Sequence, residues 1–233
     1  EMVAEEPNQR PVLVTINNQT EARPQSGLNA ADIVFEMLAE GEGTRLLALY
    51  QSELPETDGP IRSARKYFID VAKGFDAFYV AHGYSPEAKV LLEKGVVDHF
   101  NGIQYDGVYF TRMKHRKAPH NSYLTQENFK LAEKKLKFEL EAQNFVPYSF
   151  YEKDEDVKIG MAAPTIHVKL SNAKSYQSVY EYVEPEGTYS RTQGDKLSTD
   201  ELTDEPVAIS NLLFFEIPHH VVDQEGRREL DLT

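Results

Sequence analysis

Residues 31–65 read ADIVFEMLAEGEGTRLLALYQSELPETDGPIRSAR, and this stretch decides the fold. Two apolar runs, Asp32–Leu38 and Thr44–Tyr50, are joined by the tetrapeptide Glu-Gly-Glu-Gly. Two glycines in a short connection between apolar runs predict a β-hairpin with antiparallel strands. Glu40 and Glu42 then lie at the tip of this hairpin, and charged side chains gathered at strand ends indicate a polar site on a rigid scaffold.

The second half of the stretch predicts a loop and then a helix. Leu54–Gly59 is a loop, and Pro60 suits the first position of the helix that follows. Apolar residues then recur at helical spacing, and we expect them to face the core: Ile61, Ala64, Phe68, Val71 and Phe75. Arg62 and Arg65 fall outside this stripe and share one face of the expected first turns. Free N–H groups at a helix start would favour an anion there.

On either side of this stretch, strands alternate with helices. Strands are expected at Pro11–Ile16 and, as a short one, at Val108–Thr111, and a buried strand is expected at Ala77–His82. Ser85 and Thr125 are suited to cap two helices, because a hydroxyl oxygen can accept a backbone N–H. Gly95 would close the first of these helices. Residues 112–121 (RMKHRKAPHN) form a basic loop.

After residue 144 the pattern changes to short strands without helical periodicity. The expected strands are Thr165–Leu170, Ser178–Val183, Thr188–Arg191 and Leu212–Ile217, with a hairpin turn at Glu186-Gly187. The sequence therefore predicts an α/β N-terminal domain with a mixed sheet and helices, followed by a smaller, mostly-β C-terminal domain. The expected segments are a polar lead-in from a removed anchor region at 1–10, the α/β domain with the Arg/Glu site at 11–150, a linker at 151–160, and a β-rich domain at 161–233 that is incomplete at its C-terminus.

Composition excludes several classes of function. The chain has 233 residues and a formal net charge of −13, which disfavours general nucleic-acid binding because a phosphate backbone needs a basic face. Positive charge is local, since no acid lies between Asp106 and Glu127, and an anion can be received there. The absence of cysteine excludes a disulfide framework, a thiol nucleophile and a zinc–thiolate site. No phosphate-loop or dinucleotide motif occurs, so we expect no cofactor.

The chain resembles the YerB-like family of bacterial lipoproteins, which has no established biochemical activity. The resemblance is carried by Arg10–Ile16, Ala22–Leu28 (ARPQSGL), Ala31–Glu36, Glu40–Arg45, Gly59–Arg65 (GPIRSAR), Tyr84–Pro86, Arg116–Asn121 (RKAPHN) and Tyr182–Arg191. It implies an α/β N-terminal domain, a mostly-β C-terminal domain, and a protein on the extracytoplasmic face of the cell membrane. It also implies anchoring through a lipidated N-terminal cysteine that this sequence does not contain. The family offers no catalytic residues to carry over.

The preferred hypothesis is a binding or accessory module for an anionic cell-envelope component or a peptide carboxylate. Arginine can grip either group through two hydrogen bonds. The candidate ligand-binding residues are Glu42, Arg45, Arg62, Ser63, Arg65, Arg112, His115, Arg116, His120 and Asn121. Internal pairing of the arginines with Glu36, Glu40 or Glu42 is equally consistent with the pattern.

Two other functions stay open. A cell-wall glycan or muropeptide hydrolase would use Glu36 or Glu40 with His82, but nearby arginines would lower the pKa of these acids, which suits a proton donor poorly. A protein–protein interaction module would act through a tyrosine-rich β face or through a membrane-protein partner. We expect no metal site, because the spacing of His115 and His120 is not that of helical metal ligands. The sequence favours binding over catalysis and leaves the hydrolase as an alternative.

Overall fold

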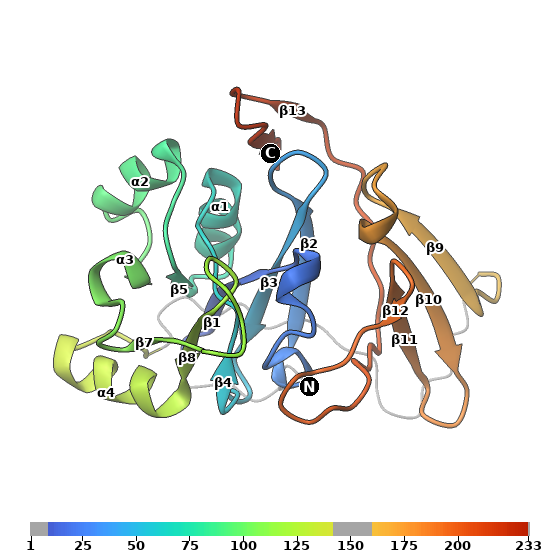
Figure 1. Cartoon of the computed structure of the whole chain (residues 1–233), viewed down its shortest axis with the longest axis horizontal. Helices are drawn as coiled ribbons and strands as arrows, with labels where there is room; N and C mark the ends of the chain where they lie inside the picture. The colour runs from blue at the N-terminus through green and yellow to red at the C-terminus, as the bar shows by residue number, and fades with distance from the viewer. Residues whose placement is uncertain (1–8, 142–159, 233) are drawn as a thin grey trace.

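A mixed five-stranded sheet forms the centre of the N-terminal part (Figure 1). The computed structural model describes residues 9–141 and 160–232. The strand order is β2-β3-β1-β5-β6. β3 pairs antiparallel with both β2 and β1, whereas β5 pairs parallel with both β1 and β6. The strands are β1 (Val12–Asn17), β2 (Ile33–Leu38), β3 (Thr44–Tyr50), β5 (Phe78–Ala81) and β6 (His99–Asn101).

The predicted β2–β3 hairpin is confirmed. Its register runs from Leu38 opposite Thr44 to Ile33 opposite Leu49. Every residue of β3 is buried, because this strand has neighbours on both sides and layers on both faces. The buried strand predicted at Ala77–His82 is also confirmed as β5.

Side chains alternate between the two faces of the sheet and build two cores. On one face, Leu13 and Leu47 pack with α1 (Lys66–Gly74) and α2 (Pro86–Glu93). On the other face, Val14 packs with the layer formed by α4 (Gln126–Leu136) and a three-stranded sheet. That sheet has the order β4 (Thr57–Asp58), β8 (Ser122–Thr125), β7 (Phe110–Arg112), and the short helix α3 (Gly102–Tyr105) follows β6.

The predicted helix caps are confirmed. Ser85 Oγ accepts the N–H of Ala88 at 3.3 Å, and Thr125 Oγ1 accepts that of Asn128 at 3.1 Å. Gly95 follows α2 with φ +66°, a left-handed conformation that glycine adopts without strain. The caps could be predicted from the sequence because the two residues that form each hydrogen bond lie only three positions apart in the chain.

The helix predicted to begin at Pro60 begins later in the chain, so the predicted start was wrong. Arg65 is the N-cap of α1, with φ −129° and ψ 158°, so residues 61–64 precede the helix in extended form. The backbone there bonds to distant strands instead, with Arg62 N–H donating to Thr15 O at 2.9 Å and His82 N–H donating to Arg62 O at 2.9 Å. Helix propensity loses to these tertiary bonds. The expected loop Leu54–Gly59 likewise contains a strand, β4.

The C-terminal part is mostly β, as predicted, and lies beyond β2 in Figure 1. One four-stranded antiparallel sheet has the order β12 (Lys196–Leu197), β11 (Thr188–Gln193), β10 (Gln177–Val183), β9 (Thr165–Lys169). The turn at Gly187 between β10 and β11 is confirmed. Two further strands, β13 (His219–Val221) and β14 (Arg228–Leu230), form a hairpin. None of the helices in the described ranges has the length and apolar character that a bilayer crossing requires.

The strand predicted at Leu212–Ile217 was wrong. Within the described residues this segment pairs with no other strand, and Leu213, Phe214 and Phe215 are exposed. Strand propensity is present there, but a strand needs a ladder partner. The expected linker at 151–160 lies, apart from Gly160, outside the described residues.

A half-buried acid, Glu36, joins β2 to the C-terminal sheet. Glu36 accepts hydrogen bonds from Arg191 at 2.6 Å and Gln193 at 2.8 Å, both from β11. From its own domain it accepts Thr44 Oγ1 at 2.8 Å and Asn18 Nδ2 at 3.0 Å. All of the described partners of Glu36 are therefore structural, and its carboxylate ties the two sheets together.

Glu201 makes a second junction. Its carboxylate accepts Ser26 Oγ at 2.8 Å, Tyr123 OH at 2.9 Å, Arg116 Nη2 at 2.8 Å and His115 Nε2 at 3.0 Å. Burial opposes ionisation of Glu201, but the hydrogen bonds from Ser26, Tyr123 and Arg116 together lower its pKa. The basic loop is thus fastened to the C-terminal part through Arg116.

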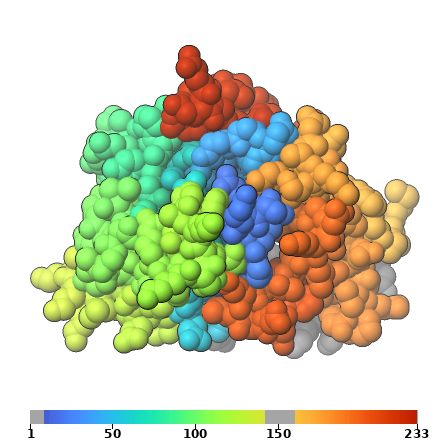
Figure 2. All heavy atoms as spheres, in the orientation of Figure 1, coloured from blue at the N-terminus to red at the C-terminus, as the bar shows by residue number. Residues whose placement is uncertain are grey.

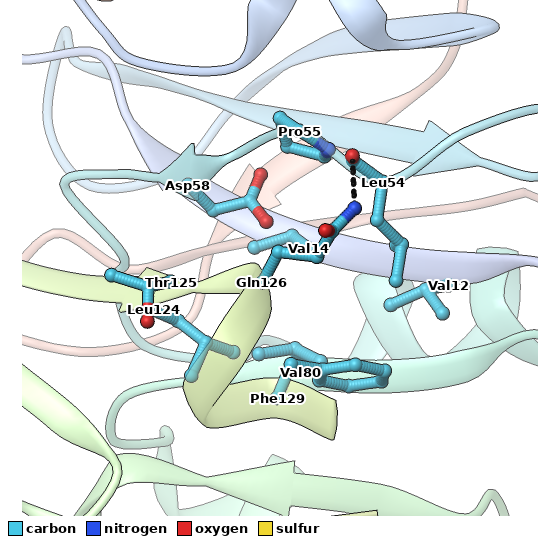
Figure 3. Close-up of a pocket in the computed structure, with 10 residues that line it drawn as sticks. All are labelled: Val12, Val14, Leu54, Pro55, Asp58, Val80, Leu124, Thr125, Gln126 and Phe129. Carbon is cyan, nitrogen blue, oxygen red and sulfur yellow. Dashed lines mark hydrogen bonds between the residues drawn. The ribbon is translucent and has the colours of Figure 1, made fainter. Parts of the chain in front are cut away.

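A small cavity of about 10 Å³ lies under β1, with Asp58 as the acid on its wall (Figure 3). Apolar side chains such as Val14 and Phe129 make up most of the wall, and Gln126 Nε2 donates to Leu54 O at 2.8 Å. Asp58 is 7% exposed and its Oδ1 has no hydrogen-bond partner among the described residues. Burial, with the nearby Asp200 acting in the same direction, raises the pKa of Asp58 to about 7.

Asp58→Asn should flatten the pH dependence of stability. Because the folded-state pKa is raised above the unfolded value of 3.8, the carboxyl favours the fold at low pH and this contribution is lost as pH rises through about 7. Between about pH 5 and pH 8 the loss is about 3 kcal/mol of unfolding free energy. Urea unfolding at both pH values would measure it, with Asp70→Asn on the exposed face of α1 as control. An unchanged slope in Asp58→Asn would contradict the assignment.

Candidate functional site

The candidate site lies at the edge of the central sheet where the parallel strands β1, β5 and β6 end. Ligands of α/β sheets bind at this kind of edge. The extended segment Ile61–Arg65 crosses it, bonded to β1 on one side and to the residue after β5 on the other. In Figure 2 the basic loop 112–121 and the segment that follows β1 lie side by side below the hairpin tip.

Glu40 at the hairpin tip holds two arginines. Its Oε1 accepts Arg45 Nη2 at 2.5 Å and also accepts Arg65 Nη2. Arg45 further donates to Ser63 O, and Arg65 Nη1 donates to Ala64 O at 2.7 Å. Both arginine side chains are only 5% exposed. Burial lowers the pKa of Arg45 to about 9, the positive charges of Arg65 and Arg62 add to the fall, and Glu40 opposes it.

Arg62 has no such partner. Among the described residues its guanidinium makes no hydrogen bond and no ion pair, and its Nε is buried. Every other arginine side chain in the described ranges donates at least one hydrogen bond. Burial lowers the pKa of Arg62, Glu40 raises it, and the charges of Arg65 and Arg112 lower it further. Three guanidiniums therefore share one nearby carboxylate.

His82 lies beside Arg62 as a neutral acceptor. Arg112 Nη2 is 3.1 Å from His82 Nε2, and because a guanidinium only donates, Nε2 must accept. The proton is then on Nδ1, which donates to Ser122 Oγ at 2.6 Å. Burial, with Arg112 and Arg62, lowers the pKa of His82. Gly102 makes room for this ring, since a Cβ there would come within 2.3 Å of Nδ1.

His120 flanks Arg62 from the basic loop. Asn17 Oδ1 accepts the Gln19 N–H at 3.0 Å, which leaves Asn17 Nδ2 to donate to His120 Nδ1 at 2.9 Å. The ring proton of neutral His120 is therefore on Nε2, which is available as a donor. Burial, followed by the charge of Arg62, lowers the pKa of His120.

Arg112 is neutralised by a neighbour. Its Nε lies 3.0 Å from Asp106 Oδ1 and its Nη2 lies 2.9 Å from Asp106 Oδ2, and hydrogen bonds from Arg112 lower the pKa of Asp106. Arg112 Nη1 also donates to Asn121 Oδ1 at 3.2 Å. The amide nitrogen of Asn121 remains as a donor.

The structure separates the sequence candidates into two groups. Those at the sheet edge are Arg45, Arg62, Ser63, Arg65, Arg112, His120 and Asn121. Glu42 lies elsewhere and accepts the Asn172 N–H at 2.7 Å, while His115 and Arg116 bind Glu201. Sequence reasoning missed Asn17, Asp106 and Ser122. A polar residue that closes an apolar strand, as Asn17 does, was the available signal.

The hydrolase candidates are not joined by hydrogen bonds to one another. Glu36 is taken by Arg191 and Gln193, and Glu40 by Arg45 and Arg65. The lone pair of His82 Nε2 accepts from Arg112, so the ring is not positioned as a free base. In the described residues no group of three or more acids and histidines is arranged to hold a metal ion.

Glu40→Gln should destabilise the protein by about 3 kcal/mol, because removal of one partner leaves two buried guanidiniums without a carboxylate. Chemical denaturation followed by circular dichroism would measure the change. Glu53→Gln is the matched control, since Glu53 is exposed and makes no side-chain hydrogen bond or ion pair with the described residues, and it should shift stability by less than about 0.5 kcal/mol. Equal effects of the two substitutions would show that Glu40 does not hold the arginines.

Comparison with known proteins places the chain in a family. Residues 1–139 match the N-terminal domain, and residues 166–233 the C-terminal domain, of DUF3048, a protein family of unknown function. A Bacillus subtilis relative named "Putative lipoprotein YerB" is 43% identical over 224 residues, which are 96% of this chain and 67% of the relative. The crystal structure of the Bacillus subtilis YerB protein superposes with a TM-score of 0.86 at 40% identity, covering all of this chain and 77% of that one. The YerB-like resemblance is therefore confirmed, and the chain belongs to the DUF3048 family.

Proposed function

We propose that this protein is a binding or accessory module that captures an anionic group of a cell-envelope component, or a peptide carboxylate, at Arg62. The observation that carries the proposal is the guanidinium of Arg62, which is half-buried and has no partner among the described residues. A charge withdrawn from water is costly unless a partner compensates it. An anion bound from solution would supply that partner.

The surroundings of Arg62 support an anion. Glu40 already binds two arginines, so its single carboxylate does not balance the third. The rim is built from donors: Arg112, the Nε2–H of His120 and the amide of Asn121. Arg45 and Arg65, both sequence candidates, act in this proposal through Glu40, holding the segment that presents Arg62.

The proposed location is the extracytoplasmic face of the cell membrane, with a lipid anchor. Support comes from the name of the Bacillus subtilis relative, "Putative lipoprotein YerB", and from the 43% identity that this chain shares with it. An anchor would hold the module at the membrane surface and so raise its effective concentration near envelope ligands or a membrane-protein partner.

Arg62→Ala should weaken binding of inorganic phosphate about ten- to hundredfold, the range expected for loss of charge-assisted hydrogen bonds. Stability should change by less than about 1 kcal/mol, because no carboxylate loses its partner. Isothermal titration calorimetry and thermal unfolding would measure the two quantities. Arg62→Lys keeps the charge but lacks the planar guanidinium, so its phosphate affinity should lie between those of the parent protein and Arg62→Ala.

Lys94→Ala is the matched control, since it removes one exposed positive charge at the end of α2 and should bind like the parent protein. If Arg62→Ala unfolds the protein, Arg62→Gln replaces it, and a folded Arg62→Gln that binds phosphate as tightly as the parent would show that Arg62 is structural. Equal phosphate affinity in folded Arg62→Ala and the parent would also contradict the proposal.

A further inference from the structure

We propose that the site around Arg62 selects a dianion of the phosphate-monoester class over singly charged carboxylates and phosphodiesters. This inference rests on the proposed function and adds the charge and shape of the ligand. It follows from the balance of fixed charges at the sheet edge and from the direction of the hydrogen bonds there.

The charge balance leaves two positive charges over. Four guanidiniums, of Arg45, Arg62, Arg65 and Arg112, face two carboxylates, of Glu40 and Asp106. A singly charged ligand would leave half of this surplus uncompensated, and a dianion would compensate it fully.

The two histidines add no charge near neutral pH. The ring nitrogens that accept are identified by their partners, Arg112 for His82 Nε2 and Asn17 for His120 Nδ1. Glu21 is the remaining acid that acts on His120, but it is exposed and is not among the charges that shift the pKa of Arg62. Solvent screens such a group strongly.

Most of the free hydrogen-bonding groups at the site are donors. The guanidinium of Arg62, the Nε2–H of His120 and the amide nitrogen of Asn121 are unused, whereas Asn17 Oδ1, Asn121 Oδ1 and His82 Nε2 already accept. Glu40 Oε2 is an acceptor that no described group binds, because both arginines donate to Oε1. A ligand that accepts hydrogen bonds at several oxygens therefore fits these donors. A phosphate monoester offers three terminal oxygens and carries close to two negative charges above about pH 7.

Calorimetric titration at about pH 8 with methyl phosphate, dimethyl phosphate and acetate tests the preference for a dianion. Only methyl phosphate carries two negative charges at this pH, whereas the phosphodiester and the carboxylate carry one. Methyl phosphate should bind about tenfold more tightly than either of the others, which corresponds to one favourable charge interaction. Arg62→Ala should remove this preference and Lys94→Ala should keep it. Arg62→Gln, which also removes the positive charge, tests the same point if the alanine variant is unfolded.

The outcomes distinguish the two proposals. Equal affinities for the three probes would overturn the dianion inference and leave the proposed anion-binding function standing. No binding of any probe, with the protein shown to be folded, would overturn both. Vesicles of phosphatidic acid in phosphatidylcholine identify the source: binding that methyl phosphate inhibits supports a lipid headgroup, and binding of the soluble ester alone supports a soluble monoester.

Discussion

The carboxylate of Glu40, bound by the buried guanidiniums of Arg45 and Arg65, is the interaction on which the rest of the site depends. It joins the tip of the β2–β3 hairpin to the segment that leads into α1, so the hairpin cannot move without disturbing the helix start. The C-terminal hairpin closes over the same tip, where Gly41 N–H donates to Gly226 O at 2.9 Å and Arg228 N–H donates to Ala39 O at 3.0 Å. Three parts of the chain are therefore held in one place.

This arrangement gives the acidic residues different tasks. Glu36 and Glu201 connect the C-terminal part to the sheet and to the basic loop, and Glu40 orders arginines within the N-terminal part. Each of these carboxylates has internal partners. Among the described residues, Arg62 is the arginine whose side chain has no such partner; the segment carrying it is fixed instead by backbone bonds to Thr15 and His82. A rigid backbone with an open guanidinium is suited to recognition.

Much of the fold could be predicted from the sequence, because its signals are local. The Glu-Gly-Glu-Gly turn, the caps at Ser85 and Thr125, and the glycine turn in the β domain depend on adjacent residues. The start of α1 could not, because hydrogen bonds to strands far along the chain keep Arg62 out of the helix. The contacts at the candidate site could not be predicted, since the hydrogen-bonded pair of Asn17 and His120 spans 103 positions. No periodicity in one sequence reports such a contact.

The central claim is that Arg62 is open to a ligand while Arg45 and Arg65 are closed by Glu40. A phosphate titration followed in proton–nitrogen correlation NMR spectra of the arginine Nε–H groups tests it most directly, with the Arg62 signal assigned by its loss in Arg62→Lys. The account predicts a saturable shift that is largest for Arg62 and small for the distant Arg10 and Arg227. A shift of equal size at all arginines, or none at Arg62, would contradict it.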